Sequence, residues 1–529
     1  MEADIPPLIQ QMQQPGFYPH PVEKPIRLLQ THISYVLLAG DYAYKVKKPV
    51  NFGFLDFTTL EKRHDCCQTE LRLNRRLSPD LYLAVLPIAE VAGRYHFATS
   101  PEEADQIVEY AVQMRQFSQD LLFSHLLKDG HLTPELVQQL GRAVANFHAQ
   151  AETNPEIQTY GSVAAIRRVD DNNFNLSQPF IGSVQTQSQY EETRAFTSQY
   201  LTTHADWIEQ RQAEDKVREC HGDLHLNNVC LYEDAICIFD CIEFNREFRN
   251  IDVIYDAAFL IMDLEFQGRR DLANLFLNTY LEHTGDYEGA KLLPLYLTMR
   301  AYIRANVNAF ALQDTSIPES EKLEFRQRSA DYYHLAWTYT RRSPGYLILM
   351  CGVSGSGKST VARQLAQRLH ALHLRSDAVR KHLANIPLYA SGAQAGNAHS
   401  GIYTAAMTEQ TYRRLQELGL QLAQQGWPVI LDAKYDRYAL RQSVIEAAQA
   451  AQVPLRIVMC NAPLDVLEQR LRSRQGDISD ATLDLLATQL EAAEPLLPQE
   501  QTLATLLHTE QPLDAQLAPL LSQLNTGSF

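Results

Sequence analysis

The sequence predicts a multidomain protein in which an α+β module is followed by an α/β domain. Its 529 residues exceed what one hydrophobic core organises, so roughly two to four domains are expected. In the first part, short strand-like segments precede a long helical stretch, which is typical of a small sheet lobe joined to a helical lobe. From Tyr346 onward, apolar strands alternate with helical segments, and this alternation favours a mostly parallel sheet.

Composition indicates an ordinary globular protein, with 45% hydrophobic and 21% charged residues. The N-terminus lacks a basic region followed by an apolar core, so no secretory signal is expected. No apolar run approaches the ~20 residues needed to span a bilayer. The eight cysteines lack the paired spacing of a zinc site, and several lie in apolar runs typical of buried thiols. We therefore expect a cytoplasmic protein with no membrane partner.

The net charge of −16 lies almost entirely before Tyr346, and the remainder of the chain is close to neutral. A broadly acidic surface does not attract nucleic acid through counterion release. Nucleic acid is therefore a possible but disfavoured partner, bound only if a local basic cleft exists. The sequence carries no signal that fixes an oligomeric state.

The first module is expected over residues 25–338, after an irregular Pro- and Gln-rich lead-in over residues 1–24. Its small lobe is predicted over about 25–113 and its helical lobe over about 114–338. Within the small lobe, the pattern indicates strands around Gly40-Asp41 and a following helix. From Gln106 to about Ala336 the chain is expected to be mostly helical. The predicted elements are strands within 33–50, 82–92, 95–98, 229–231 and 236–240, and a helix near 59–77.

A polar loop within the helical lobe has the spacing of a phosphoryl-transfer site. It runs His221-Gly222-Asp223 to Asn228 and is followed by the strand Ile236–Phe239, which ends at Asp240. Asp223 can accept a hydroxyl proton, whereas Asn228 and Asp240 can hold Mg²⁺ across the phosphates of ATP. His221 is expected to brace the loop rather than to perform chemistry.

This loop resembles that of aminoglycoside phosphotransferases and choline kinases, and the resemblance covers roughly residues 30–335. It implies a protein-kinase-like fold that uses ATP and Mg²⁺. It also implies a strand lysine that contacts the α/β-phosphates and pairs with a helix glutamate. Lys45 and Lys47 share one strand face; we favour Lys45, with Glu70 as its partner. The chain lacks the glycine-rich motif that often precedes this lysine.

Other polar residues of this module leave two interpretations open. Glu243 is either a metal or acceptor contact or a structural residue. Asp256 is expected to tie the helical lobe together. Arg300 and Arg304 share a helix face and either line the acceptor site or dock the second domain.

A linker is expected over residues 339–345, followed by the second domain over residues 346–529. The apolar strand Tyr346–Cys351 leads into Gly352-Val353-Ser354-Gly355-Ser356-Gly357-Lys358-Ser359-Thr360, which is a Walker A loop placed between a strand and a helix. Its backbone N–H groups and helix N-terminus bind phosphate, Lys358 reaches the β/γ-phosphates and Ser359 ligates Mg²⁺. The predicted nucleotide-binding residues are Gly352, Ser354, Gly355, Ser356, Gly357, Lys358, Ser359 and Thr360.

Further polar residues follow the later strands of this domain. Asp377 and Arg380 stand one helical turn apart and form either a base with an acceptor clamp or an N-cap aspartate with a surface arginine. Asp432 ends an apolar strand at the position of a metal carboxylate. Three arginines, Arg470, Arg472 and Arg474, suit a lid over the transferred group or a solvated face.

Residues 346–510 resemble the zeta-toxin, polynucleotide-kinase and gluconate-kinase branch of P-loop kinases. In that branch the corresponding aspartate is the general base, which implies that Asp377 is the base and that Arg380 holds the acceptor. Arg470 and Arg474 are then the catalytic lid candidates. The sequence thus predicts a bifunctional ATP-dependent kinase whose two domains phosphorylate hydroxyls of small molecules. The alternatives are a nucleic-acid 5′-hydroxyl kinase in the second domain and a nucleotide-sensing, regulatory first domain.

Overall fold

The computed structural model describes residues 5–22, 25–53, 55–314, 317–390, 401–473, 478–479 and 483–525. The chain forms two compact units. Unit 1 comprises Met1–Asp263 and Leu295–Trp337, and unit 2 comprises Leu264–Pro294 and Thr338–Phe529. The segment 264–294 therefore packs with the C-terminal residues, although its position in the sequence lies within the first predicted module.

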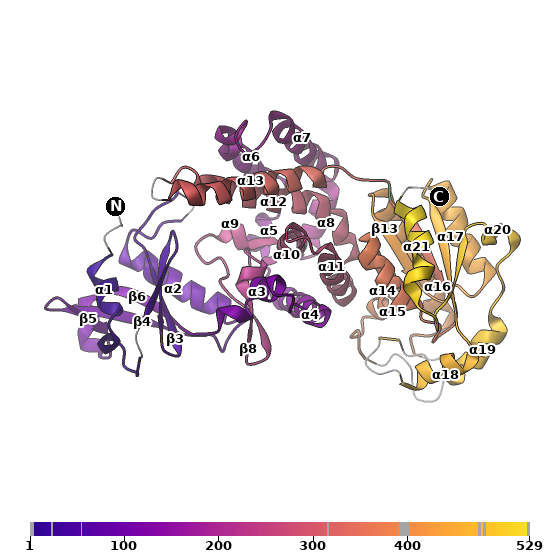
Figure 1. The fold of residues 1–529 in the computed structure, drawn as a ribbon, viewed down its shortest axis with the longest axis horizontal. Coiled ribbons are helices and arrows are strands. Elements are labelled where there is room, and N and C mark those ends of the chain that lie inside the picture. The colour runs from indigo at the N-terminus through magenta and orange to yellow at the C-terminus, as the bar shows by residue number, and fades with distance from the viewer. Residues whose placement is uncertain are drawn as a thin grey trace. The chain divides into compact units, whose positions relative to one another are not determined.

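Unit 1 begins with a six-stranded antiparallel sheet in the order β1-β2-β3-β6-β4-β5 (Figure 1). The expected hairpin around Gly40 is formed by β2 and β3, whose residues Val36 and Lys45 pair directly. Two short helical segments precede the sheet: α1 (Pro7–Met12) and η1 (Pro15–Phe17). The strands are β1 (Arg27–Gln30), β2 (Ser34–Ala39), β3 (Tyr42–Lys47), β4 (Tyr82–Val91), β5 (Arg94–Phe97) and β6 (Ile107–Arg115).

The expectation that helical structure begins at Gln106 is wrong for Ile107–Arg115, which form strand β6 between β3 and β4. The segment is a short apolar run rich in β-branched and aromatic residues, and such runs have no decisive helical or strand period. Pairing on both sides buries Ala111 and Val112, and this tertiary burial determines the strand conformation.

Helix α2 (Leu60–Asn74) packs on this sheet (Figure 1). Its Glu70 accepts a hydrogen bond from Lys45 of β3. Its first turn is capped by the Thr59 hydroxyl, which accepts a hydrogen bond from the Lys62 amide. The buried positions recur every three or four residues, as expected for one face of a helix. They are Arg63, Cys66, Cys67, Glu70, Leu73 and Asn74.

The helical lobe of unit 1 surrounds two small antiparallel pairs, β7–β10 and β8–β9, which frame the polar loop. These strands are β7 (Val217–Glu219), β8 (Val229–Tyr232), β9 (Ala235–Ile238) and β10 (Asn250–Asp252). The main helices are α4 (Pro134–Gln150), α6 (Val163–Ser177), α7 (Gln187–Thr203), α8 (Ala205–Ala213), α10 (Val253–Phe266), α12 (Leu293–Ala311) and α13 (Glu319–Tyr339). Shorter segments are η2 (Pro101–Gln106), η3 (Gln119–Leu121), α3 (Phe123–Lys128), α5 (Pro155–Thr159), η4 (Gln178–Phe180), η5 (Leu226–Asn228) and α9 (Arg246–Arg249).

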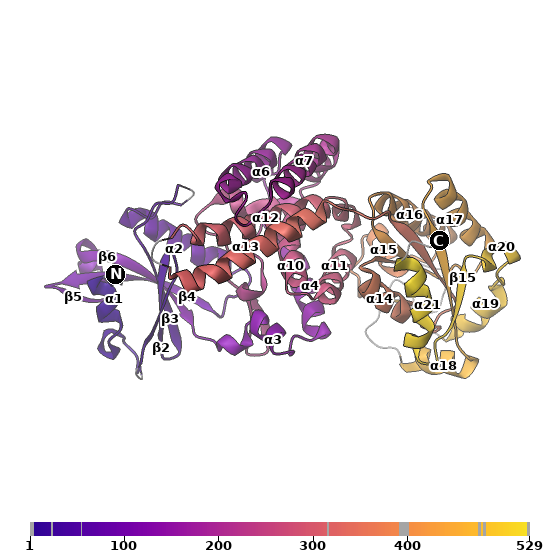
Figure 2. The same cartoon turned by 45° about the horizontal axis from the view of Figure 1, so that its top comes forward.

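Unit 2 contains a five-stranded parallel sheet in the order β12-β13-β11-β14-β15. Alternate residues of β11 face opposite layers. Ile348 and Met350 join the core that α14 and α21 cover, whereas Leu347 faces α16 near Gly419. Figure 2 shows α14 and α21 grouped together, with α16 and α17 in a second group. Helices on both faces confirm the predicted α/β domain.

The strands of unit 2 are β11 (Tyr346–Cys351), β12 (Leu372–Arg375), β13 (Pro428–Asp432), β14 (Leu455–Asn461) and β15 (Ala504–His508). Its helical segments are α11 (Arg270–Thr284), η6 (Tyr287–Lys291), α14 (Lys358–Leu369), α15 (Ser376–Leu383), α16 (Ala405–Gln424), α17 (Tyr438–Ala450), α18 (Leu464–Ser473), α19 (Asp484–Ala492), α20 (Pro498–Gln501) and α21 (Leu513–Asn525). Among the described residues, no helix combines the length and apolar character that a membrane span requires.

Candidate active sites

The polar loop of unit 1 places Asp223 between β7 and η5. Gly222, immediately before it, has φ +87°, and a Cβ there would lie 2.7 Å from the Phe248 carbonyl oxygen. Only glycine fits this turn without displacing backbone. The Asn228 amide nitrogen donates hydrogen bonds to the Asp223 carbonyl oxygen (2.9 Å) and to its Oδ2 (3.1 Å). Because both bonds use the nitrogen, the amide oxygen is the atom able to ligate a cation.

His225 is a second partner of Asp223 that the sequence did not single out. Its Nδ1 accepts a hydrogen bond from the Asn227 amide, so in the neutral ring the proton lies on Nε2, 3.2 Å from Asp223 Oδ2. Burial raises the pKa of Asp223, but His225 and Arg304 outweigh this effect and hold that pKa below its ordinary value. Asp223 is therefore ionised at neutral pH, and its carboxylate is oriented by Asn228 and His225.

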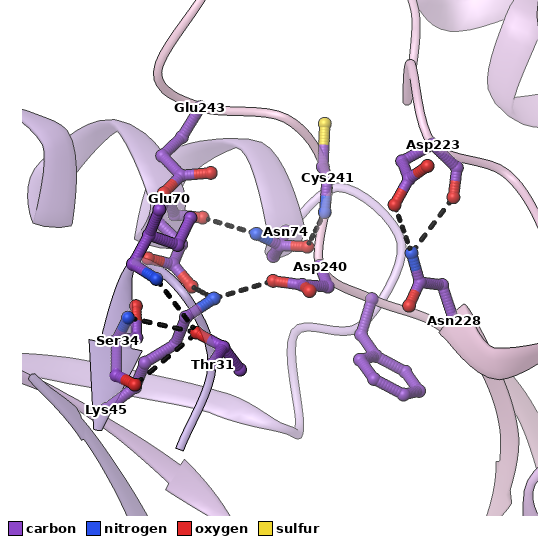
Figure 3. A network of polar contacts seen from close by, with 12 residues as sticks. Thr31, Ser34, Lys45, Glu70, Asn74, Asp223, Asn228, Asp240, Cys241 and Glu243 are labelled. Atoms are coloured by element: carbon purple, nitrogen blue, oxygen red, sulfur yellow. Dashed lines mark hydrogen bonds and ion pairs between the residues drawn. The ribbon is translucent and has the colours of Figure 1, made fainter. Parts of the chain in front are cut away.

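Geometry distinguishes the two lysines that were candidates for the phosphate contact (Figure 3). Lys45 Nζ lies 2.8 Å from Glu70 Oε1 and 2.6 Å from Asp240 Oδ1. Asp240 is the half-exposed member, with 46% of its side chain accessible, whereas Glu70 is fully buried. Asp240 also has φ +62°, a conformation that non-glycine residues adopt rarely and mostly at functional sites. Lys45, rather than Lys47, thus lies beside the predicted metal carboxylate.

Lys47 points from the same strand face into the interior. It contacts Glu70 Oε2 at 2.7 Å and forms an ion pair with Glu243, and its side chain is fully buried. Burial opposes ionisation of Glu70, but Lys45 and Lys47 together lower the pKa of that carboxyl to about 2. Glu243, for which two interpretations were open, is paired with this buried lysine, which favours the structural one.

The Asp256 carboxylate holds the polar loop by accepting hydrogen bonds from its backbone. Its Oδ1 accepts from the Gly222 amide (2.9 Å), and its Oδ2 accepts from the His221 amide (3.0 Å) and lies 3.1 Å from His148 Nε2. The His221 ring contacts the Phe239 carbonyl through Nε2 (2.9 Å) and thereby links the two catalytic segments. These contacts support bracing roles for Asp256 and His221.

The two arginines of α12 differ in their contacts. Arg300 is buried, donates to the Gly222 carbonyl (3.1 Å) and stacks on Tyr255, so it supports the loop. Arg304 contributes to the low pKa of Asp223, and its own pKa is raised: burial lowers it, whereas Tyr332 and Asp223 raise it. Arg304 therefore interacts electrostatically with Asp223.

The Gly-rich loop of unit 2 leaves the central strand β11 and enters α14. Gly352, Gly355 and Gly357 have φ of +136°, +82° and +84°, and a Cβ on Gly352 would lie 2.4 Å from the Cys460 carbonyl oxygen. Lys358 Nζ donates to the Val353 carbonyl across the loop (2.9 Å). Ser359 and Thr360 follow in the first turn of α14, with Ser359 half-buried and Thr360 exposed.

Two other donors of the loop differ in whether they are occupied. The Ser354 amide already donates to Gln489 Oε1 at 2.9 Å. The Ser356 hydroxyl is buried and lacks a hydrogen-bond partner within the described chain. A buried, unsatisfied donor beside backbone N–H groups at a helix N-terminus fits a phosphate group.

The carboxyl ends of β12 and β13 bring two carboxylates to the same sheet edge. Asp432 pairs in register with Arg375, and its Oδ2 lies 3.0 Å from His373 Nε2. His373, together with Arg375 and Lys358, lowers the pKa of Asp432 despite its burial. Burial raises the pKa of Asp377, which lies in the first turn of α15, two residues beyond β12. One carboxylate thus stays ionised, as a metal ligand requires, and the other is shifted toward the range of a general base.

Arg380 is buried one turn beyond Asp377. Its Nη1 donates to Thr408 Oγ1 (3.1 Å) and to the Ile402 carbonyl (3.3 Å). Its Nε has no hydrogen-bond partner among the described residues. Because Arg380 is buried, the alternative interpretation of a surface arginine is wrong. Its unused Nε donor is available to bind an anion.

The three lid candidates have different environments. Arg470 holds the Gly-rich loop by donating to the Gly355 carbonyl (3.2 Å) and to Thr509 Oγ1 (2.8 Å). Arg472 is exposed and pairs with Glu468 one turn away. Arg474 lies outside the described residues. A lid role for these arginines stays a prediction.

Oxygen donors dominate both candidate metal sites: Asn228 and Asp240 in unit 1, and Ser359 and Asp432 in unit 2. Amide, hydroxyl and carboxylate oxygens fit a hard divalent cation. His225 and His373, which orient Asp223 and Asp432, were not predicted. The sequence does show His225 as the second histidine of the polar loop. His373 lies in an apolar strand, where no sequence pattern distinguishes it from a core residue.

Comparison with known proteins agrees with this geometry. Residues 70–293 match the family model described as "Phosphotransferase enzyme family", and residues 347–496 match one described as "AAA domain". Thermoresistant gluconokinase of Escherichia coli is 25% identical over 185 residues, which are 34% of this chain and 95% of that protein. A choline/ethanolamine kinase family protein from Mesorhizobium loti covers 60% of this chain and 92% of its own, with 12% identity and a TM-score of 0.36.

The folds and the two family-model matches define an ATP-dependent kinase that joins a phosphotransferase domain to a P-loop kinase domain, and such domains use ATP with a divalent metal. The predicted fusion is thereby confirmed. Protein Rv2004c of Mycobacterium tuberculosis is 30% identical over 470 residues, which are 88% of this chain and 90% of that protein. The chain belongs to the same family as Rv2004c.

Proposed function

We propose that this kinase is bifunctional and that each domain transfers the γ-phosphoryl group of Mg·ATP to a hydroxyl of a small molecule. The observation that carries the proposal is that each unit contains two separate carboxylates. We assign one of them to accept the hydroxyl proton of the acceptor and the other to hold Mg²⁺. In unit 1, Asp223 faces the acceptor hydroxyl while Asn228 and Asp240 hold Mg²⁺ and Lys45 contacts the phosphates. In unit 2, Asp377 is the base, and Ser359 and Asp432 hold Mg²⁺.

For unit 2 we propose an acidic, hydroxylated small molecule as acceptor. Lys358 and the loop amides bind the phosphates, and Arg380, with its unused Nε donor, binds the acceptor anion. The similarity to a gluconokinase supports this class. In the sequence, the two catalytic domains are proposed to span 25–338 and 346–529, with the segment 264–294 of the first span packed in unit 2. We propose that the protein acts in the cytoplasm, where Mg·ATP is supplied.

The test uses the full chain with γ-labelled ATP, a small-metabolite extract and, in parallel, a 5′-hydroxyl RNA. Asp223→Asn and Asp377→Asn are compared with two control variants at exposed carboxylates outside both sites, Asp129→Asn and Glu446→Gln. We expect two sets of labelled metabolites, one lost in each active-site variant and neither in the controls. Label confined to RNA and lost in Asp377→Asn would instead establish a nucleic-acid end kinase. If Asp223→Asn leaves every labelled product unchanged, unit 1 transfers no phosphoryl group in this assay and is regulatory.

A further inference from the structure

Helix α11 (Arg270–Thr284) and the turn η6 lie within the residues that match the phosphotransferase family, yet they pack in unit 2. Helix α11 lies against α14 and β12 (Figure 1). It ends at Gly285 with φ +70°, where a Cβ would lie 2.8 Å from the His382 ring. The Trp427 indole donates to the Ala290 carbonyl at 3.1 Å. This segment is therefore built into the P-loop unit by close, specific contacts.

Asn278 of α11 completes the open edge of the parallel sheet. Strand β12 is the edge strand and is paired on one side only, with β13. On the other side, Asn278 Nδ2 donates to the Ala371 carbonyl (3.0 Å), and its Oδ1 accepts from the His373 amide (2.8 Å). One side-chain amide thus satisfies a donor and an acceptor that a neighbouring strand would otherwise satisfy.

Two residues of β12, His373 and Arg375, contact α11 and also lie beside Asp432. The His373 ring lies 3.0 Å from Asp432 Oδ2. Arg375 Nη1 lies 3.1 Å from Glu282 Oε1, one helical turn beyond Asn278 on α11, and Arg375 is the in-register neighbour of Asp432. Contacts therefore run from Asn278 through His373 to Asp432, the last residue of β13, and Glu282 holds Arg375, the in-register neighbour of Asp432.

We propose that α11 is a working part of the P-loop active site and that Asn278 and Glu282 are its positioning residues. Asn278 fixes the backbone of His373, so that the imidazole holds Asp432 in the orientation that binds the nucleotide's metal ion. Glu282 holds Arg375 and keeps its guanidinium from taking the place of that ion beside Asp432. This inference rests on the proposed metal role of Asp432, but it does not depend on either acceptor.

Asn274 provides a matched control on the same helix. Its Nδ2 donates to the same Ala371 carbonyl at 3.0 Å, but no bond joins it to the His373 amide. A loss of interface packing or of one hydrogen bond would affect Asn274→Ala and Asn278→Ala alike. Asn274 Oδ1 also accepts from Asn278 Nδ2 at 3.0 Å, but in Asn274→Ala the Asn278 side chain keeps its bonds to the Ala371 carbonyl and the His373 amide. A direct positioning effect on His373, and through it on Asp432, is therefore specific to Asn278.

The experiment measures the affinity of the full chain for a fluorescent ADP analogue with and without Mg²⁺. Binding that survives in Lys358→Met belongs to unit 1 and is subtracted. The readout is the factor by which Mg²⁺ strengthens binding in unit 2. Orienting partners of metal ligands typically contribute roughly 10-fold or more to metal affinity, so His373→Ala should lower this factor by about that amount. Asn278→Ala and Glu282→Gln should each lower it several-fold, whereas Asn274→Ala should not.

The double variant Asn278→Ala/His373→Ala should be no worse than His373→Ala alone, because Asn278 acts through His373. Hydrogen exchange at the His373 amide should accelerate in Asn278→Ala and not in Asn274→Ala. If Asn278→Ala unfolds unit 2, the isosteric Glu282→Gln carries the test. An unchanged Mg²⁺ factor in Glu282→Gln and Asn278→Ala, or an equal decrease in Asn274→Ala, would overturn the proposal. A wild-type chain that phosphorylates neither extract nor RNA would contradict the proposed function but not this inference.

Discussion

Lys45 and Lys47 contact the same glutamate, and the structure predicts that their removal has opposite consequences. Lys47 is fully buried between Glu70 and Glu243, whose side chains are 0% and 4% exposed. In Lys47→Met, the Glu243 carboxylate is left with a weak hydrogen bond from the Cys66 thiol at 3.6 Å. Removing one partner of a buried ion pair costs about 3–5 kcal/mol, because a charge is left uncompensated in the interior. Unit 1 should lose about this much stability.

Lys45→Met should instead abolish nucleotide binding by unit 1 at a small cost in stability. Glu70 keeps Lys47, and Asp240 is 46% exposed, so water solvates the charge that is left unpaired. An exposed pair contributes about 0–1 kcal/mol. The matched control for that figure is Lys62→Met, which breaks the exposed pair with Asp56.

The assay is urea unfolding followed by pulse proteolysis of unit 1, combined with binding of a fluorescent ATP analogue to the folded variants. The double variant Lys47→Met/Glu243→Gln should recover part of the lost stability, because the uncompensated charge is removed with its partner. The reasoning is refuted if Lys45→Met destabilises unit 1 more than Lys47→Met does, or if Lys47→Met is as stable as the wild type.

Three further predictions follow from single features. Burial raises the pKa of Asp170 from 3.8 to about 7, so the folded state retains a proton that the unfolded chain releases. The free energy of unfolding should therefore fall as pH rises from about 4 to 7. Asp170→Asn should remove this dependence and raise the free energy of unfolding by as much as about 4 kcal/mol at pH 8, measured by urea unfolding at several pH values. Gly352→Ala should abolish nucleotide binding by unit 2 and spare unit 1, since its Cβ would lie 2.4 Å from a carbonyl oxygen; retained binding in a titration would contradict the loop geometry. All eight cysteines are buried thiols, so a thiol reagent should label none in the native chain and all eight in denaturant; rapid native labelling of any one would show local opening.

The sequence predicts the P-loop site better than the kinase-like site because the former is local. Phosphate contacts in unit 2 come from one contiguous loop, whose strand, glycines and helix are readable in order. The lysine, glutamate and aspartate of unit 1 are separated by up to 195 positions and meet only in the fold. The sequence alone does not distinguish Lys45 from Lys47, because the two lysines share one strand face. The structure separates them by their partners: Lys47 pairs with Glu243 and Lys45 with Asp240.

The predictions that failed or were missing also have physical causes. The sequence predicts helix where strand β6 forms, because the strand conformation depends on partners on both sides and no local pattern records them. His373 was missed because a histidine in a buried apolar strand looks like an ordinary core residue. Its significance depends on Asp432, 59 residues later, and on Asn278, 95 residues earlier.

The position of α11 also determines how the two activities can be separated by experiment. In the sequence, α11 lies between α10 and α12, and these helices carry Asp256 and Arg300, which hold the polar loop of unit 1. In space, α11 belongs to unit 2. A cut at the linker 339–345 would therefore remove Asn278 and Glu282 from the P-loop unit and leave β12 with an open edge. Loss of activity in such a fragment would not show that unit 2 depends on catalysis by unit 1, because the fragment lacks part of its own fold. Point substitutions in the full chain, Asp223→Asn against Asp377→Asn, avoid this ambiguity.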